Sequence, residues 1–253
     1  MAVASGMTGS SGEDRVSNIL KWVLLAVAIG TFGLLGWATD VTYRTAPPQP
    51  DRFLTHGGAV LMTAADIVDG KASFQEADLM DYGSLYGMGS YFGEDYTAQN
   101  LVRLAALTED NISKARFGRP LAALGAEQQA AVRTAMQAEL KGVDLTRASV
   151  ELPVSLASAV ATLKSRIVTE LLNNDFIKGW TMAYSLDRQS ATKTADFLIY
   201  CSLTTVARRP GSDVSWTQNW PYEPVVGNTP TTSTFLWTWI SFCFTFFCFG
   251  LVL

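Results

Sequence analysis

The sequence contains few of the residues from which metal centres and hydrolytic active sites are usually built. Its 253 residues include one histidine, His56, and three cysteines, Cys201, Cys243 and Cys248. They do not have the spacing of zinc ligands, and no CxxCH motif for covalent haem attachment is present. Structural zinc and covalently bound haem c are therefore excluded. His56 lies in a glycine-rich stretch, where a lone histidine is usually a solvated side chain rather than a catalytic base.

Charged residues are also scarce. They make up 17% of the chain, below the roughly 25% that is typical of soluble globular proteins, and the mean hydropathy is positive at +0.16. The formal net charge is −4 and no basic run occurs. Nucleic acid is excluded as a partner, because neutralising phosphates with lysine and arginine supplies most of that affinity. The composition instead indicates that some segments lie in lipid.

Residues 19–39 form the first of two apolar runs that are long enough to cross a membrane. The run contains one lysine and carries Trp22 and Trp37 near its ends, where interfacial aromatic side chains are favoured. Its length exceeds the apolar region of a usual signal peptide, which favours an anchor over a cleaved signal. We therefore expect a transmembrane helix here.

Residues 233–253 form the second apolar run. This segment has no charged residue, and Trp237 and Trp239 lie near its start. It too has the length and composition of a transmembrane helix. Since no polar flank follows the run, we expect this helix to be cut short at the C-terminus.

Between the two runs lie residues 40–232, which are mostly polar and numerous enough to bury a core of their own. Thr63 and Asp66 resemble a capping box, and Asp95 or Thr97 is expected to cap a later helix. The best strand signal is at residues 150–154, which Pro153 interrupts. Helical periodicity and capping predict helices over residues 63–78, from 95 to beyond 107, and over 126–141, 156–173 and 190–208. The fold class is therefore a mainly α membrane protein.

Residues 82–98 are unusual because glycines alternate with aromatic side chains. The Gly89 carbonyl and the Tyr91 phenol are oxygen ligands of the kind that Ca²⁺ accepts. The competing interpretation is a glycine-rich turn, packed by tyrosine and phenylalanine, that precedes a helix. The segment lacks the strand–turn–helix context of a GxGxxG nucleotide loop, so phosphate binding is excluded.

Residues 208–231 lead into the second apolar run and are called the connector below. Its prolines and tryptophans predict an extended, rigid chain at the membrane surface. Trp220 and Glu223 in the connector, together with Tyr82 in the glycine-rich segment, are weaker candidates for packing or interface residues.

Two motifs resemble one known family. SWTQNWPYEPVVGNTPT, which follows RPG and precedes the second apolar run, resembles the connector before the second helix of quinol-dependent nitric oxide reductases, a branch of the haem-copper oxidase superfamily. YGSLYGMGSYFGEDYTAQNL is similar to the GSxWGHGAYxxPDWTAxxL motif of that family. Met88 stands where that motif has histidine, and Glu94 where it has proline. A second interpretation, that the chain is a divergent relative similar to nitric oxide dismutases, therefore stays open.

This resemblance implies an arrangement across a bacterial inner membrane. Residues 1–18 would be a flexible cytoplasmic N-terminus, and residues 40–232 a periplasmic cytochrome c-like domain that lacks haem, followed by its connector. The resemblance assigns Gly89 and Tyr91 to a calcium ion that bridges to haem propionates. Residues 233–253 would be the start of the catalytic helix bundle, and haem b, haem b3 and the non-haem iron would belong to the part of that bundle that is absent from this chain.

The resemblance also implies a function. The intact enzyme would reduce two NO molecules to N₂O and water with quinol as electron donor, and the chain would cap the catalytic bundle, with that bundle and membrane lipid as its partners. This chain alone lacks the haem and iron ligands, since imidazole ligation needs more than His56. The alternative is a non-enzymatic, membrane-tethered periplasmic module whose amphipathic helices bind a partner.

Overall fold

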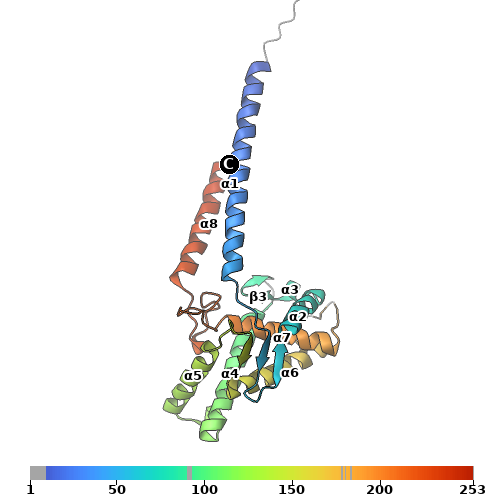
Figure 1. The fold of residues 1–253 in the computed structure, drawn as a ribbon, viewed down its shortest axis with the longest axis vertical. Coiled ribbons are helices and arrows are strands. Elements are labelled where there is room, and N and C mark those ends of the chain that lie inside the picture. Colours follow the sequence, from blue (N-terminus) through green and yellow to red (C-terminus); the bar gives the residue numbers. More distant parts are fainter. Residues whose placement is uncertain (1–9, 90–92, 178, 180, 183, 253) are drawn as a thin grey trace, which may run out of the picture. The chain divides into compact units, whose positions relative to one another are not determined.

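The computed structural model describes residues 10–89, 93–177, 179, 181–182 and 184–252. It divides into two compact units, Met1–Ala46 and Pro47–Leu253, which are considered separately. The described part of the first unit is dominated by one helix, α1 (Ser10–Thr45). The second unit contains all other elements (Figure 1).

Two helices have the length and composition of membrane spans. The apolar part of α1 is Val16–Thr45, with a mean hydropathy of 2.0, and that of α8 (Thr232–Val252) is Thr232–Gly250, with 1.3. At a rise of 1.5 Å per residue these stretches are about 45 and 28 Å long, against a hydrocarbon core of about 30 Å. Neither is buried within the protein. α1 extends beyond the predicted residues 19–39.

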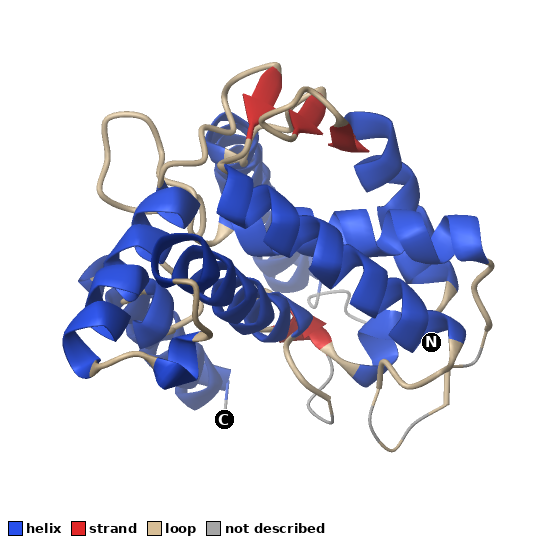
Figure 2. Ribbon diagram, turned by 90° about the horizontal axis from the view of Figure 1, so that it is seen from below, coloured by secondary structure: helices blue, strands red, loops and turns tan. Residues whose placement is uncertain are grey.

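The core of the second unit is built around α7. Figure 2 shows that helices make up most of this unit and that its strands are short. α7 packs against α2, α4 and α6, and α5 packs against α4. The bounds of these helices are α2 (Ala64–Glu76), α4 (Tyr96–Phe117), α5 (Ala126–Lys141), α6 (Val154–Leu172) and α7 (Arg188–Thr204).

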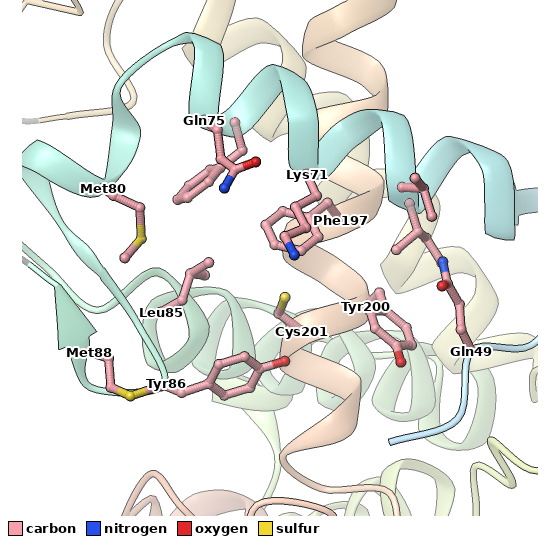
Figure 3. A pocket seen from close by; sticks show the side chains of 13 residues that line it. Gln49, Lys71, Gln75, Met80, Leu85, Tyr86, Met88, Phe197, Tyr200 and Cys201 are labelled. Carbon is pink, nitrogen blue, oxygen red and sulfur yellow. The ribbon is translucent and has the colours of Figure 1, made fainter. Parts of the chain in front are cut away.

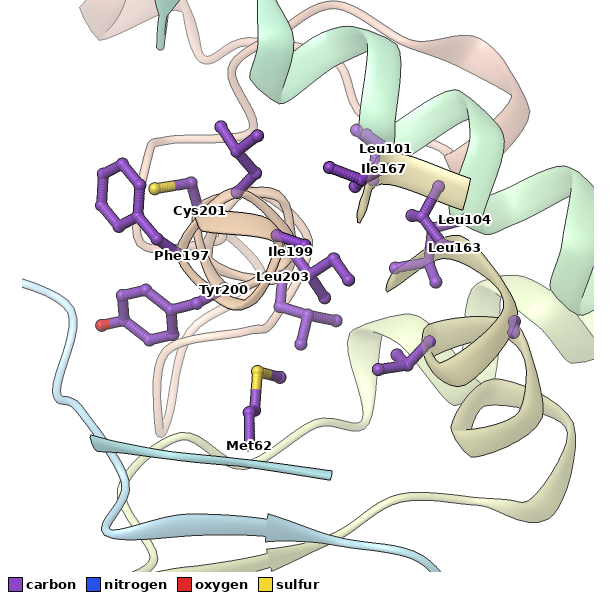
Figure 4. Close-up of a cluster of buried hydrophobic side chains, with 14 of the residues drawn as sticks. Met62, Leu101, Leu104, Leu163, Ile167, Phe197, Ile199, Tyr200, Cys201 and Leu203 are labelled. Atoms are coloured by element: carbon purple, nitrogen blue, oxygen red, sulfur yellow. The ribbon is translucent and has the colours of Figure 1, made fainter. Parts of the chain in front are cut away.

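Apolar side chains from three helices meet in the centre of this core (Figure 4). α4 contributes Leu101 and Leu104, α6 contributes Leu163, and α7 contributes Ile199 and Leu203, all with no exposed surface. Burying each such side chain stabilises the fold by about 1.5–3 kcal/mol. The spacing of these residues along each helix places them on one face, which is why the amphipathic pattern in the sequence predicts this packing.

Short elements complete the unit: β1 (Arg52–Leu54), β2 (Val60–Thr63), α3 (Leu79–Tyr82), β3 (Ser84–Leu85), β4 (Met88–Gly89), η1 (Leu121–Ala123), β5 (Ser149–Glu151) and η2 (Pro224–Val226). β1 lies between β2, to which it is antiparallel, and β5, to which it is parallel. Phe53 pairs with Met62 on one side and with Val150 on the other, and all three are buried. The sheet therefore covers one edge of the helical core.

Most predicted helices are present, with shifted ends. The Thr63 capping box begins α2, Asp95 caps α4 through Ala98 N, and α5 has its predicted bounds. α6 begins two residues earlier than predicted, directly after Pro153, because proline suits a position that donates no helical hydrogen bond. The predicted strand at 150–154 is corrected to Ser149–Glu151, since it ends before this proline.

Two further predictions are wrong. α7 ends at Thr204 rather than at residue 208, because the chain turns away and Arg208 pairs with Ser215. The connector is not extended: it folds into turns, with positive φ angles at Gln218 and Asn219 and the 3₁₀ turn η2. Its placement at a membrane surface stays a prediction.

A buried ion pair joins α6 to α7. The Lys164 ammonium lies 2.7 Å from Asp196 Oδ1 and also donates to the Leu61 carbonyl at 2.9 Å. Burial raises the pKa of the Asp196 carboxyl to about 6, and the attraction of Lys164 offsets only part of this effect. The pair therefore fixes how the two helices meet at some cost in desolvation.

Candidate functional site

The glycine-rich segment is folded against the N-terminus of α4 by one carboxylate. Asp95 Oδ1 accepts from Ala98 N at 2.8 Å, and Oδ2 accepts from Ser84 Oγ at 2.8 Å and from Gly87 N at 2.5 Å. Both carboxylate oxygens are therefore committed within the protein. The interpretation as a turn that precedes a capped helix agrees with this geometry.

Close packing requires several glycines in this segment, among them Gly83, where a Cβ would lie 2.7 Å from the Glu94 carbonyl oxygen. A Cβ on Gly93 would overlap the Tyr82 carbonyl oxygen. Gly87 has a φ of +75°, and a Cβ there would lie 3.1 Å from the Trp220 ring. Glycine thus lets the chain that follows the β3–β4 hairpin approach Tyr82, and lets the hairpin approach the connector.

The calcium prediction rests on two residues, of which the structure describes one. Gly89 ends β4 and pairs with Ser84 of β3, whereas Tyr91 lies outside the described residues. Within the described residues no group of three histidine, cysteine, aspartate or glutamate side chains could hold a metal ion. Of the two described carboxylates at the end of the motif, Asp95 accepts hydrogen bonds within its own segment, and Glu94 accepts one from the Gln99 side chain. The calcium site therefore stays a prediction.

The weaker candidates lie close to the glycine-rich segment or in the connector. The Tyr82 carbonyl packs on Gly93, and the half-buried Trp220 ring packs on Gly87. Glu223 Oε1 accepts from Val225 N at 3.1 Å and begins η2. The structure thus places Trp220 against the glycine-rich segment that contains Tyr82, and gives Glu223 a capping role in the connector.

The connector is held to the helical domain by side chains of α5 and by one of its own. Gln137 of α5 donates to the Val225 carbonyl at 2.7 Å, and Lys141 donates to the Gly227 carbonyl at 3.1 Å. The buried Asn228 amide donates to the Thr205 carbonyl, just after α7, at 2.9 Å. These bonds fix the chain that leads towards α8.

His56 lies far along the chain from these residues, in the turn between β1 and β2. Its side chain is 75% exposed, and Nδ1 lies 2.5 Å from the Glu151 carboxylate on β5. This is the surface position that a solvated histidine takes.

Sequence reasoning missed a cavity of about 620 Å³ beside the glycine-rich segment. Figure 3 shows side chains from α2, α7 and the β3–β4 hairpin pointing into it. Its lining is mainly apolar, and it consists of Gln49, Ile67, Val68, Lys71, Phe74, Gln75, Met80, Leu85, Tyr86, Met88, Phe197, Tyr200 and Cys201. These residues come from three separate stretches of sequence, so no local motif marks the cavity.

Apart from Lys71 and Gln75, the polar side chains in the cavity wall are hydrogen-bonded within the protein or uncharged. The Tyr86 hydroxyl lies 2.9 Å from Thr204 Oγ1, and the Tyr200 hydroxyl donates to the Pro48 carbonyl at 3.2 Å. Burial raises the pKa of Tyr86 well above its usual value, and that of Tyr200 to about 12. Burial also raises the pKa of the Cys201 thiol to about 12, so this cysteine is not a nucleophile at neutral pH.

Comparison with known proteins identifies the domain. Residues 50–222, more than half of the chain, match the family model for the cytochrome c-like domain of the nitric oxide reductase NorB. This range begins just before β1 and includes the glycine-rich segment, almost all of the cavity and the first half of the connector. A search of curated protein sequences found no match. The chain belongs to the family of the NorB cytochrome c-like domain of nitric oxide reductases.

Proposed function

We propose that this chain is the N-terminal, haem-free part of a quinol-dependent nitric oxide reductase-like enzyme of a bacterial inner membrane. The observation that carries the proposal is the order of its parts: a domain of this family lies between two helices of membrane length. In the intact enzyme, quinol would supply two electrons and two protons to convert two NO molecules to N₂O and water.

The residues present do not fit a covalent haem c, although the family is named for its likeness to cytochrome c. Thioether attachment needs the two cysteines and the histidine of CxxCH. Among the residues that line the cavity, Cys201 is the one cysteine. The single histidine of the chain is on the β1–β2 turn instead. We therefore assign haem b, haem b3 and non-haem iron to the catalytic part and no redox step to this chain.

The proposed role of the domain is to cap the catalytic bundle on its periplasmic face. The hydrogen bonds from α5 and from Asn228 hold the connector, and Trp220 ties it to the glycine-rich segment. A rigid connector would transmit the position of the domain to the start of α8, and so to the helices that follow in the enzyme.

Purification of the tagged chain from its native membranes tests this role. We expect haem b, iron and quinol-dependent NO consumption to copurify with it. Replacing Trp220 with alanine should lower the haem recovered per chain, whereas Lys114→Gln, on the exposed surface of α4, should not. A colourless preparation without iron would contradict the proposal, because the chain would then not be bound to a catalytic part.

We further propose that Gly89 and Tyr91 contribute to a calcium site shared with the catalytic part. Calcium accepts both carbonyl and side-chain oxygens, and the remaining ligands would come from the partner. In the purified enzyme, Tyr91→Phe should lower calcium content and alter the haem spectrum. Tyr184→Phe is the matched control, since Tyr184 is 61% exposed and lies outside the glycine-rich segment. Equal calcium in both variants would rule out the role of Tyr91.

A further inference from the structure

The cavity beside the glycine-rich segment has the form of a binding site rather than a packing gap. Its volume of about 620 Å³ lies within the range of roughly 300–1,000 Å³ that is usual for small-molecule sites. Val68, Met80 and Met88 at its rim are 57%, 36% and 69% exposed, so apolar surface continues from the interior to the outside. An exposed apolar rim around an apolar interior favours an apolar ligand.

One charged side chain lines this cavity. Lys71 of α2 is the one charged side chain among the thirteen lining residues, and Figure 3 shows its amine directed into the space above Cys201. Lys71 is exposed and forms no ion pair with any residue that the structure describes. Its ammonium is therefore hydrated and free to bind an anionic group at the mouth of the cavity.

Apart from the exposed, uncharged amide of Gln75, the other polar groups leave little for a ligand to bind. The hydroxyls of Tyr86 and Tyr200 have partners within the protein, and Gln49 Nε2 donates to the Ala64 carbonyl at 3.0 Å. The interior thus offers apolar contact, and the mouth offers one positive charge. That combination is complementary to a long apolar chain with a single anionic head.

The chain itself ties this cavity to a candidate membrane helix. Gln49 in the cavity wall is four residues after Thr45, where α1 ends, and four residues span at most about 14 Å. Tyr200 holds the intervening residues through the Pro47 and Pro48 carbonyls. The cavity wall thus follows a candidate membrane helix closely along the chain, which favours the bilayer as the source of a ligand.

We propose that the cavity binds a single-chain fatty-acid anion, with its carboxylate at Lys71 and its acyl chain between α2, α7 and the β3–β4 hairpin. The proposal uses the membrane setting of the proposed function only as the source of this ligand. It is distinct from quinol binding, because a neutral quinol has no charge for Lys71 to bind.

Photolabelling in membranes that contain the full chain tests the site. A palmitate that carries a diazirine near its methyl end is added, illuminated, and located by mass spectrometry of peptides. We expect labels on peptides of α2 and α7 as well as on α1 and α8. Lys71→Gln should lower labelling of the α2 and α7 peptides about tenfold, the loss expected for one charge-assisted hydrogen bond.

Two controls separate charge from folding. Lys71→Arg keeps the positive charge and should retain the label, and Lys114→Gln removes a lysine that is paired with Asp110 on α4 and should change nothing. Labelling of α1 and α8 serves as an internal reference, because it depends on the bilayer and not on Lys71. A neutral photoreactive alcohol of the same length should label the cavity peptides weakly.

Competition by unlabelled fatty acids measures the apolar part of the site. Each further methylene that enters the cavity should raise affinity about fourfold, until the cavity is full. Labels confined to α1 and α8 would overturn the proposal while leaving the membrane assignment intact. Cavity labelling of Lys71→Gln that equals that of the wild type, or labelling by the alcohol that equals that by the palmitate probe, would also overturn it, because the site would then not select an anion.

Discussion

At the scale of single residues, Gly70 decides how closely two helices approach. A Cβ on Gly70 of α2 would overlap the Lys193 carbonyl oxygen of α7 and lie 3.1 Å from Phe197 Cβ. Because the obstacle is backbone, it cannot move aside as the end of a side chain could. Glycine is therefore required here by contact and not by backbone conformation.

Replacing Gly70 with alanine should destabilise the domain by about 3 kcal/mol, through a forced separation of α2 and α7. The readout is the temperature at which the buried Cys201 becomes reactive to a thiol reagent, in a background where Cys243 and Cys248 are alanine. Gly125→Ala is the matched control, since a Cβ there meets nothing within 4 Å. Similar reaction temperatures for both variants would contradict the prediction.

Asp196 should make stability depend on pH. Its carboxyl has a pKa of about 6 in the folded chain, against 3.8 as its ordinary value, so the folded state binds the proton more tightly. The resulting stabilisation is complete below about pH 4 and is lost as the pH rises through 6, a change of roughly 3 kcal/mol. The cause is burial, which penalises the charged form more than Lys164 compensates.

Thermal unfolding between pH 4 and pH 7 measures this effect. The unfolding temperature of the wild type should fall across that interval relative to Asp196→Asn, which does not titrate. Asp81→Asn, at an exposed position of α3, should keep the wild-type slope. Parallel curves for the wild type and Asp196→Asn would show that the carboxyl has no raised pKa.

At the scale of elements, one N-cap organises the glycine-rich segment. The Asp95 carboxylate accepts hydrogen bonds from Ala98, Gly87 and Ser84, so it joins the start of α4 to the β3–β4 hairpin. A conventional N-cap satisfies only the helix. Loss of this side chain should therefore release two elements together.

Asp95→Ala should cost about 2 kcal/mol, because it leaves backbone donors without their acceptor. Asp95→Asn keeps one acceptor oxygen and should have an intermediate effect. Asp187→Ala removes the N-cap of α7, whose side chain accepts from Ser190 N within the same helix. It should lower the temperature at which Cys201 becomes reactive by less than Asp95→Ala does. An equal effect of the two alanine variants would mean that the hairpin contacts add nothing.

Local sequence signals predict elements better than they predict how elements meet. The bounds of α5 and the caps at Thr63 and Asp95 follow from side chains within a few residues. The β1–β5 pairing is not predictable in this way, because Arg52 and Ser149 are 97 residues apart and each strand is three residues long. The turns of the connector likewise depend on contacts with α5 and with Thr205.

The candidate site likewise has parts that follow from local sequence and parts that depend on long-range packing. The sequence motif correctly indicates a glycine-rich turn before a capped helix, since glycine and aspartate act locally. The cavity is missed because Lys71 on α2 and Cys201 on α7 meet only when those helices pack. The family likeness, in contrast, rests on motifs of the linear sequence and is confirmed over residues 50–222.

At the scale of the whole molecule, charge does not orient the chain in a membrane. Arg15 and Lys21 at one end of the first apolar run are matched by Arg44 and Arg52 at the other, and large domains cross largely regardless of such charges. The proposed periplasmic position of the domain therefore needs a direct chemical measurement.

The topology can be measured by labelling introduced cysteines in intact spheroplasts. In a background where Cys243 and Cys248 are alanine, His56→Cys places a thiol on the exposed β1–β2 turn, and Ala4→Cys places one before α1. If α1 spans the membrane with the domain in the periplasm, a membrane-impermeant maleimide should label position 56 at once and position 4 only after permeabilisation. Asp213→Cys, exposed in the connector, should behave like position 56. The reverse pattern would place the domain in the cytoplasm. Immediate labelling of both positions would mean that α1 does not span the membrane, because a spanning helix puts positions 4 and 56 on opposite sides and the bilayer then shields one of them from the reagent.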